Sequence, residues 1–348
     1  MNTENPPFLV ARYALIIAIV GGLAALLTFA AGGLGGTGVT AQEFVDLQQG
    51  HTVHAGFRRA HAKGFCVAGE FVSSGALEPH TTATLFASQT TPFVGRLSIA
   101  GSNPTAPDLK APVRSLALSF AVGEREAWRT AMNTPPVMAV RTPEDFFLQL
   151  SALAPDRESG KRDPGKISRF FDEHPESKAF TDWASNYQPT GSLATEKYHS
   201  INAFYLVNSG GKRQAVRWQA RPVARETGIR PAPGRDALHR EFFRRLGQGP
   251  VKFDLVFTLA APEDDADDPT RPWPQSRRQL VAGQLVINSA TPQAGGACEG
   301  ISFDPLVLPH GMEPTRDPIL RARSAAYAES YRRRAREHWL GRAGEAGE

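Results

Sequence analysis

The sequence predicts an α+β fold that is mainly β: an antiparallel β-barrel with surrounding helices, preceded by a hydrophobic N-terminal helix. Three observations support this prediction. The chain has 348 residues, of which 41% are hydrophobic and 21% charged, a composition typical of a globular protein with a sizeable core. One long uncharged stretch lies near the N-terminus. The remainder shows short runs rich in β-branched and aromatic residues between turns, with most helical patterns gathered elsewhere.

The N-terminal segment Tyr13–Leu34 contains 22 residues and no charge, enough to cross a bilayer core of about 30 Å as a helix. Arg12 precedes it, which favours a cytoplasmic N-terminus. The length favours a retained anchor, because the core of a signal peptide has only about 7–15 residues, whereas Val39-Thr40-Ala41 offers a cleavage site after Ala41. We therefore predict that residues 1–41 are a membrane anchor or signal segment. Residues 42–348 would form one exported domain, anchored in the inner membrane and facing the periplasm, or soluble in the periplasm after cleavage.

The predicted strands are runs bounded by Gly, Pro or Ser. They are Gly64–Ser73, Phe93–Ala100, Ser115–Val122, Asn202–Val207, Gln214–Ala220, Lys252–Ala260 and Gln279–Asn288. The fourth and fifth strands flank Asn208-Ser209-Gly210-Gly211, a connection typical of a hairpin. The last two are joined by the polar loop Glu263–Pro274 and form a second predicted pair.

Two helices are predicted, Asp236–Leu246 and Pro318–Leu340. The second follows Asp317, a suitable N-cap, and begins with Pro318, which is tolerated in the first turn. The polar, Pro-rich residues 154–189 are predicted to form a long surface excursion.

Charge and cysteine content exclude several classes of protein. The net charge of +4 is small and gives no overall nucleic-acid footprint, so no nucleic-acid partner is predicted. Cys66 and Cys298 are too few for a disulfide scaffold and lack the spacing of a zinc site. In an exported domain they are able to pair, but the sequence alone leaves that pairing open.

Three groups of residues carry candidate chemistry. His61 lies in Arg58–Gly64 and has the unperturbed pKa of a general base, although a lone histidine is more often a structural hydrogen-bonder. Asn133 stands just before Thr134-Pro135, which we interpret as the entry of a strand made rigid by the proline and which is by itself a turn. Arg323 and Tyr327 share one helical face, so the arginine can favour a phenolate, an uncommon ligand of haem iron. Such a pair more often serves packing.

Taken together and in order, these groups resemble the haem catalases, and most closely the small catalase-related peroxidases. Four segments carry the resemblance: FRRAHAKGFCVAGEF, VGRLSIAGSNP, MNTPPVMAVR and FDPLVLPHGMEPTRDPILRARSAAY. The last is the most specific, because it combines a GMEP preface with Arg-x-x-x-Tyr. The resemblance covers roughly residues 44–335.

The resemblance implies a role for each matching residue and haem b (iron protoporphyrin IX) as the cofactor. His61 would move a proton between the peroxide oxygens, Asn133 would hold the peroxide, and Ser98 would bond the other nitrogen of His61. Tyr327 would be the axial ligand of the haem iron, with Arg323 stabilising its phenolate. The remaining cofactor-binding residues would be Arg58, Arg96 and Arg334 at the haem propionates and Phe146 in the distal pocket. Core packing is the alternative role for Phe146.

The sequence also departs from the full-size catalases. Only 21 residues follow Tyr327, Ala60 replaces a bulky aliphatic residue, and Met138 stands where an aromatic is common. These departures predict a roomier pocket. Together with the resemblance to the small peroxidases, they imply a peroxidase that reduces organic hydroperoxides, and hydrogen peroxide weakly, with an unknown electron donor. The alternatives are a true hydrogen-peroxide-dismutating small catalase, a hydroperoxide-rearranging haem enzyme and a non-enzymatic haem-binding protein. The oligomeric state is left open, a homodimer included.

Overall fold

The computed structural model describes residues 13–15, 20–22 and 38–342, except 124–125, 157, 227 and 229–230. Residues 1–40 and 41–348 form two separate units, of which the second contains the barrel. Most of the predicted anchor Tyr13–Leu34 lies outside the described residues. Among the residues that are described, no helix is both long and apolar enough to cross a bilayer.

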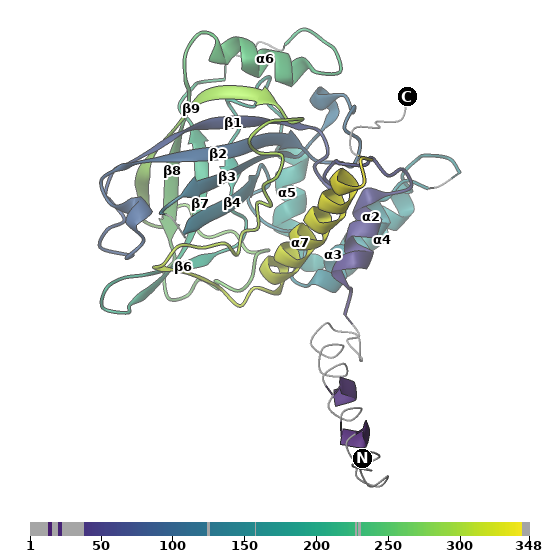
Figure 1. The fold of residues 1–348 in the computed structure, drawn as a ribbon, viewed down its shortest axis with the longest axis horizontal. Coiled ribbons are helices and arrows are strands. Elements are labelled where there is room, and N and C mark those ends of the chain that lie inside the picture. Colours follow the sequence, from purple (N-terminus) through teal and green to yellow (C-terminus); the bar gives the residue numbers. More distant parts are fainter. Residues whose placement is uncertain are drawn as a thin grey trace, which may run out of the picture. The chain divides into compact units, whose positions relative to one another are not determined.

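Within the described part of the chain, eight antiparallel strands close into a barrel (Figure 1). In chain order they are β1 (Gly64–Ser73), β2 (Thr90–Ile99), β3 (Arg114–Ala121), β4 (Ala127–Asn133), β5 (Tyr198–His199), β7 (Arg213–Pro222), β8 (Val251–Leu259) and β9 (Gln279–Pro292). The pairing of β7 with β8 completes the ring, and β6 (Phe204–Val207) and β10 (Met312–Pro314) extend the sheet from β7. The predicted antiparallel barrel is therefore confirmed.

The barrel interior is filled by side chains. In β3, Leu116, Leu118 and Phe120 alternate with smaller residues and are completely buried. Phe120 stacks on Trp128 of β4 at 4.9 Å between ring centroids, inside the largest hydrophobic cluster. Ala117, which points to the other side of the sheet, packs in a separate cluster outside the barrel. A large ligand therefore has to bind outside the barrel.

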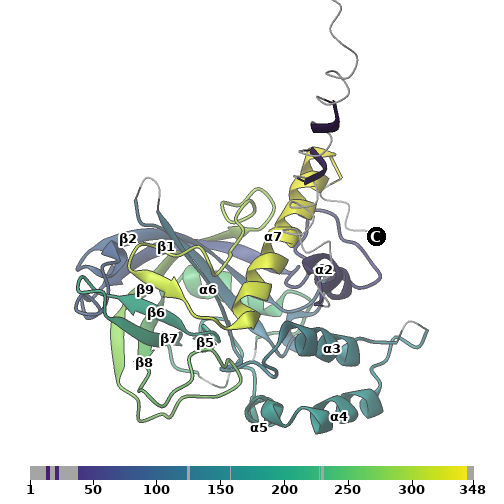
Figure 2. The same cartoon turned by 90° about the horizontal axis from the view of Figure 1, so that it is seen from below.

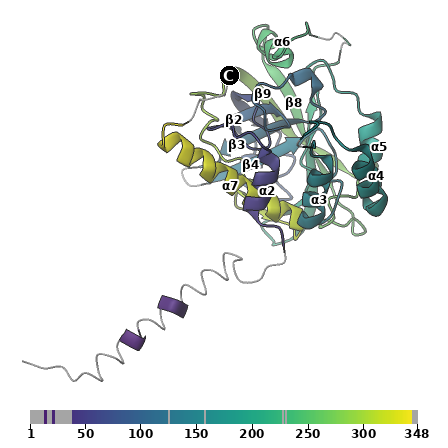
Figure 3. The ribbon, with the colours of Figure 1, turned by 90° about the vertical axis from the view of Figure 1, so that its right-hand side faces the viewer.

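Helices cover one flank of the barrel. There α7 (Pro318–Trp339) packs against α2 (Ala41–Gln49) and α3 (Pro143–Leu153). Figures 2 and 3 show α4 (Pro164–Glu173) and α5 (Lys178–Asn186) continuing this group. The helix α6 (Ala237–Leu246) lies apart from it and contacts β9.

Several predicted elements are confirmed, and one region contains two helices that were not predicted. Both predicted hairpin pairs form, and α7 begins after Asp317, whose side chain accepts a hydrogen bond from the backbone of Ile319. Residues 154–189, predicted as a long surface excursion, contain α4 and α5. The first of these helices is capped by Asp163, which accepts from two backbone N–H groups and is followed by Pro164.

Cys66 and Cys298 form a disulfide with 5.3 Å between their Cα atoms. The bond links β1 to the segment that follows β9, across 232 positions of sequence. It packs with Phe303 and Tyr327 on the outer side of the barrel. The structure therefore resolves a pairing that the sequence left open.

Candidate active site

A cavity of about 1120 Å³, including the solvent at its mouth, lies between the outer face of the barrel and α7. All nine residues that the sequence predicted for the site line it: Arg58, His61, Arg96, Ser98, Asn133, Phe146, Arg323, Tyr327 and Arg334. They come from the segment between α2 and β1, from β2 and β4, and from α3 and α7. Residues from both ends of the domain therefore meet in one place.

The barrel wall of the cavity is built by strand register. Ser98, Ser115 and Asn133 lie opposite one another on β2, β3 and β4, so their side chains form one row. Ala117 and Ala131 are paired in the row two residues along. Because all five side chains are small, the wall leaves room for a broad ligand.

His61 faces this row from the segment before β1, where it forms an isolated bridge with Gly101 of the turn after β2. Its Nδ1 lies 3.3 Å from the hydroxyl of Ser115, which donates a hydrogen bond to Oδ1 of Asn133. Ser98, which the resemblance predicted in this role, lines the cavity but makes no side-chain hydrogen bond among the described residues. The alternation of small and large residues in β3 already placed Ser115 on the same face as Ala117.

The environment of His61 keeps its imidazole neutral. Burial, followed by the nearby cations Arg96 and Arg323, lowers the pKa of His61 to about 3. A neutral imidazole has a free lone pair and can take a proton from a bound acid at physiological pH. His61 therefore has the protonation state that a general base requires.

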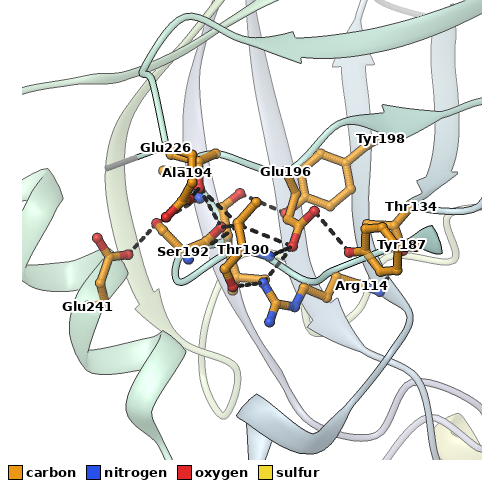
Figure 4. A network of polar contacts seen from close by, with 12 residues as sticks. Arg114, Thr134, Tyr187, Thr190, Ser192, Ala194, Glu196, Tyr198, Glu226 and Glu241 are labelled. Atoms are coloured by element: carbon orange, nitrogen blue, oxygen red, sulfur yellow. Dashed lines mark hydrogen bonds and ion pairs between the residues drawn. The ribbon is translucent and has the colours of Figure 1, made fainter. Parts of the chain in front are cut away.

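A buried polar network lies behind the row (Figure 4). Arg114, next to Ser115, donates to Oε1 of Glu196 at 2.6 Å and to the carbonyl of Thr190 at 2.7 Å. Tyr187 donates to the other carboxylate oxygen of Glu196 at 2.9 Å. Since Arg114 and Glu196 are almost completely buried, this ion pair fixes the start of β3 from the side away from the cavity.

The opposite wall is one face of α7, which carries Arg323, Tyr327 and Arg334. The guanidinium of Arg323 donates to Oδ1 of Asn202 and, at 2.8 Å, to the carbonyl of Ala131. Among the described residues it makes no hydrogen bond to Tyr327, although the two share a helical face. Its expected role towards the phenolate therefore stays a prediction.

Asn202 was not recognised from the sequence. While its Oδ1 accepts from Arg323, its Nδ2 donates to Asp317 at 2.6 Å. Asp317 is also the N-cap of α7, so Asn202 ties the arginine to the beginning of its own helix. The preceding residue, Ile201, has φ +67°, a strained conformation for a β-branched residue that lines the cavity.

Three further arginines of the cavity lack an anionic partner. Among the described residues, no carboxylate oxygen lies within 4 Å of Arg58, Arg96 or Arg334, and their hydrogen bonds go to neutral acceptors. Burial lowers the pKa of Arg58 and Arg334, and that of Arg96 to about 9. Buried cations without a carboxylate in direct contact make this end of the cavity a site for anions.

These residues fit a haem. Among the described residues the Tyr327 hydroxyl has no hydrogen-bond partner, so its oxygen is free to bind a metal. Nε of Arg334 is buried and unpartnered, and the arginines match the two carboxylates of the porphyrin. The small side chains of the barrel wall leave space for a flat macrocycle.

The far end of the cavity is apolar. Met138, Ile201 and Ile319 form a cluster with Phe146, whose ring lies 5.1 Å from that of Phe44 of α2. Phe44 also lines the cavity, although no helix was predicted for this part of the chain. The site thus combines a polar row, an anion-binding end and an apolar end.

Comparisons with known proteins agree with this arrangement. The model of the family described as "Catalase" matches residues 53–340. The chain is 38% identical over 319 residues to the "Catalase-related peroxidase" of Synechococcus elongatus, covering 90% of this chain and 94% of that protein. It is 28% identical over 304 residues to the "Catalase-related peroxidase" of Mycolicibacterium paratuberculosis, covering 85% and 95%. Among solved structures, "Structure of a bacterial catalase" has a TM-score of 0.72 at 22% identity, covering 84% of this chain and 60% of that one.

Proposed function

The chain belongs to the catalase family, and from this premise we propose that it is a haem b peroxidase that reduces organic hydroperoxides with an external electron donor. Hydrogen peroxide would be a weaker substrate, and oxygen release would be slight or absent. Overall, the hydroperoxide takes up two electrons from the donor and two protons, and yields an alcohol and water.

The observation that carries this proposal is the group of His61, Ser115 and Asn133 on one cavity with Tyr327. A protein that merely bound haem would need Tyr327 and the arginines, but not a neutral histidine beside an oriented amide. Neutral His61 accepts the proton of the hydroperoxide and returns it to the departing oxygen. Ser115 orients both the imidazole and the amide, and the amide of Asn133 holds the peroxide oxygen by a hydrogen bond.

Other residues hold the cofactor and exclude water. Tyr327 binds the iron, and Arg58, Arg96 and Arg334 bind the propionates. When bound, the haem supplies the redox-active iron at which the oxygen–oxygen bond is cleaved. Phe146 and Met138 make the neighbouring surface apolar, which favours a hydroperoxide with a hydrocarbon group.

The size of the substrate is inferred from the same surface. Ala60 and Met138 both line the cavity, where a smaller and a more flexible side chain replace the bulkier ones of full-size catalases. An alkyl group attached to the peroxide would therefore fit beside His61. This supports organic hydroperoxides as the preferred substrates.

Parallel assays of one purified preparation test the proposal. Oxidation of a chromogenic donor should be faster with cumene hydroperoxide than with hydrogen peroxide, and an oxygen electrode should record little release. Oxygen evolution at the turnover of a typical catalase would overturn the proposal in favour of dismutation. Consumption of a lipid hydroperoxide without donor oxidation, with an isomerised product, would overturn it in favour of rearrangement.

We also propose that the domain is exported and held at the membrane by its N-terminal segment. The Cys66–Cys298 disulfide supports an oxidising compartment, because cytosolic proteins rarely keep structural disulfides. The full-length protein should fractionate with membranes, and protease added to spheroplasts should digest the domain. Recovery of a soluble protein beginning at Gln42, the second residue of α2, would establish cleavage after Ala41 instead.

A further inference from the structure

The segment of residues 293–301, called the acceptor segment below, follows β9 and contains turns without a helix or strand. It lies beside the arginine end of the cavity. Neither its sequence nor the resemblance to the catalases gave it a role. Four oxygens of this segment accept hydrogen bonds from arginines of the cavity.

Each of the three arginines that lack a carboxylate partner donates to this segment. Oε1 of Gln293 accepts from Nε of Arg96 at 2.7 Å and from Nη1 of Arg58 at 3.4 Å. The carbonyls of Cys298 and Ile301 accept from Nη2 of Arg58 at 3.0 and 2.8 Å. The carbonyl of Glu299 accepts from Nη1 of Arg334 at 2.9 Å.

These acceptors orient the guanidinium groups without neutralising them. An amide oxygen and three carbonyl oxygens carry no formal charge, so these four acceptors leave the positive charge of the arginines available to a ligand. The carboxylate of Glu299 in the same segment attracts Arg58 and Arg334 without a direct contact. Gln293 is itself buried and links Arg58 to Arg96 through a single oxygen. A carboxylate in its place would occupy the same bonds but remove part of the attraction for an anion.

The disulfide ties this segment to the strand beside Arg96. Cys66 is the register partner of Arg96 in the β1–β2 pair, and its sulfur is bonded to Cys298 at the centre of the segment. The approach is close, because a Cβ at Gly296 would lie 2.7 Å from the sulfur of Cys66 and 2.4 Å from the carbonyl of Pro292. Without this covalent link, the segment would be held by turn hydrogen bonds, by the arginine hydrogen bonds themselves and by packing against Phe303.

We propose that the acceptor segment, fixed by the Cys66–Cys298 disulfide, is the positioning element of the carboxylate-binding arginines, and that Gln293 is a positioning residue for haem. The proposal rests on the proposed function for the identity of the ligand. It assigns to the disulfide a role in cofactor retention in addition to stability. Gln293 contacts the arginines and acts on the ligand through them.

Esterified haem separates positioning from general stability. Iron protoporphyrin IX dimethyl ester keeps the iron and macrocycle but lacks the two carboxylates, so oriented arginines cannot favour it by charge. The full-length chain is freed of haem and titrated with haem and with the dimethyl ester. Binding is read from the Soret band, and dissociation from transfer to an excess of a haem-scavenging protein.

Gln293→Ala should weaken the binding of haem by about tenfold, the usual effect of losing a hydrogen bond to a charged group. Binding of the dimethyl ester should stay within about twofold of the unmodified protein, a small fraction of that effect. Gln293→Glu should also weaken haem binding, because its carboxylate competes for Arg58 and Arg96. Gln284→Ala, a matched change on β9, should alter neither affinity, because its side chain bonds to Asp254 on the barrel.

The double variant Cys66→Ser, Cys298→Ser should lose haem faster than the unmodified protein. Loss of the dimethyl ester should increase by a smaller factor, which reflects only the contact of the disulfide with Tyr327. Equal losses for both porphyrins in the Gln293 and cysteine variants would overturn the proposal in favour of a purely structural role. Unchanged haem binding in Gln293→Ala would overturn it directly. Failure of the unmodified protein to bind either porphyrin would instead refute the proposed function, and this inference with it.

Discussion

The barrel wall and the arginine end of the cavity are built in different ways. The wall with Ser115 and Asn133 is a row across neighbouring strands, so backbone register fixes the spacing of its side chains. The arginine end relies on the acceptor segment, which has no regular structure and is held by a disulfide. The sheet therefore sets the spacing of the Ser115 and Asn133 side chains that face His61. The arginines come from three different elements, and acceptors on a segment joined to the barrel by a disulfide orient them.

The largest effect on activity should come from Tyr327→Phe. This change lies on α7, the helix that lines both the arginine end and the apolar end of the cavity. The phenyl ring keeps the contacts with Phe303 and the disulfide, so the fold should survive while activity is lost. The Soret band of the ferric protein should shift or disappear with the phenolate ligand.

Tyr331→Phe provides the matched control one helical turn later. Tyr331 is 40% exposed, and its ring lies 5.5 Å from the guanidinium carbon of Arg334. Phenylalanine keeps this ring, so loss of the hydroxyl should leave the spectrum unchanged. If Tyr331→Phe abolishes activity and Tyr327→Phe does not, the ligand lies one turn away from the residue assigned.

His61→Ala should remove the proton transfer beside the barrel wall and leave the arginine end unchanged. Peroxide reduction should slow by about 10²-fold or more, as expected for a lost general base, while haem binding stays intact. Stopped-flow spectra of the ferric protein mixed with cumene hydroperoxide measure this step. An unchanged rate of spectral change would show that His61 does not move the proton.

Ser115→Ala against Ser98→Ala sharpens the assignment within the row. Ser115 contacts both His61 and Asn133, so its removal should slow the same step by about tenfold, the cost of roughly one hydrogen bond. Ser98→Ala should leave the rate near that of the unmodified protein. A larger loss for Ser98→Ala would restore the role that the resemblance assigned to it.

The smallest effect at neutral pH is on the free energy of unfolding, and it comes from the buried histidines His61 and His199. Burial lowers the pKa of His61 to about 3 and, again as the main cause, that of His199 to about 4. Because the unfolded chain binds these protons near pH 6.5, the free energy of unfolding should fall as the pH drops from about 6.5 towards 4. Each histidine should contribute a slope of up to about 1.4 kcal/mol per pH unit.

Urea unfolding of the haem-free protein at pH 7, 6 and 5 measures this slope. The variant His199→Gln should show a smaller loss between pH 6 and 5 than the unmodified protein, with little difference in slope above pH 7. An identical pH dependence in both proteins would mean that His199 is protonated equally in the folded and unfolded states.

The sequence predicted the parts of the fold with strong local patterns. The two hairpin pairs and α7 with its Asp317 cap follow from turn residues, alternation and capping. The short helices α4 and α5 were missed because their Pro-rich, polar surroundings resemble a loop. Asn133 was placed before a strand although it ends β4, since the proline after it belongs to the exit of the strand rather than its entry.

The site was predicted by resemblance, and its contacts were not. All nine predicted residues line the cavity, but Ser115 replaces Ser98 beside His61, a choice that depends on how β2, β3 and the segment of His61 approach one another. Gln293 and Asn202 carry no local pattern that would mark them. Gln293 lies 197 positions from its partner Arg96, and Asn202 lies 121 positions from its partner Arg323. Only the folded chain therefore brings each pair together.

The pairing of β1 with β9 also determines when the site can come into existence during biosynthesis. The segment with Arg58 and His61 leaves the ribosome early. More than two hundred residues later the ribosome makes β9, which pairs with β1, then Cys298 and then the helix with Tyr327. A nascent chain therefore carries an open sheet without a cavity. Cofactor loading and oxidation of the cysteines must both follow release of nearly the whole chain, so they compete with proteolysis of an unfinished barrel.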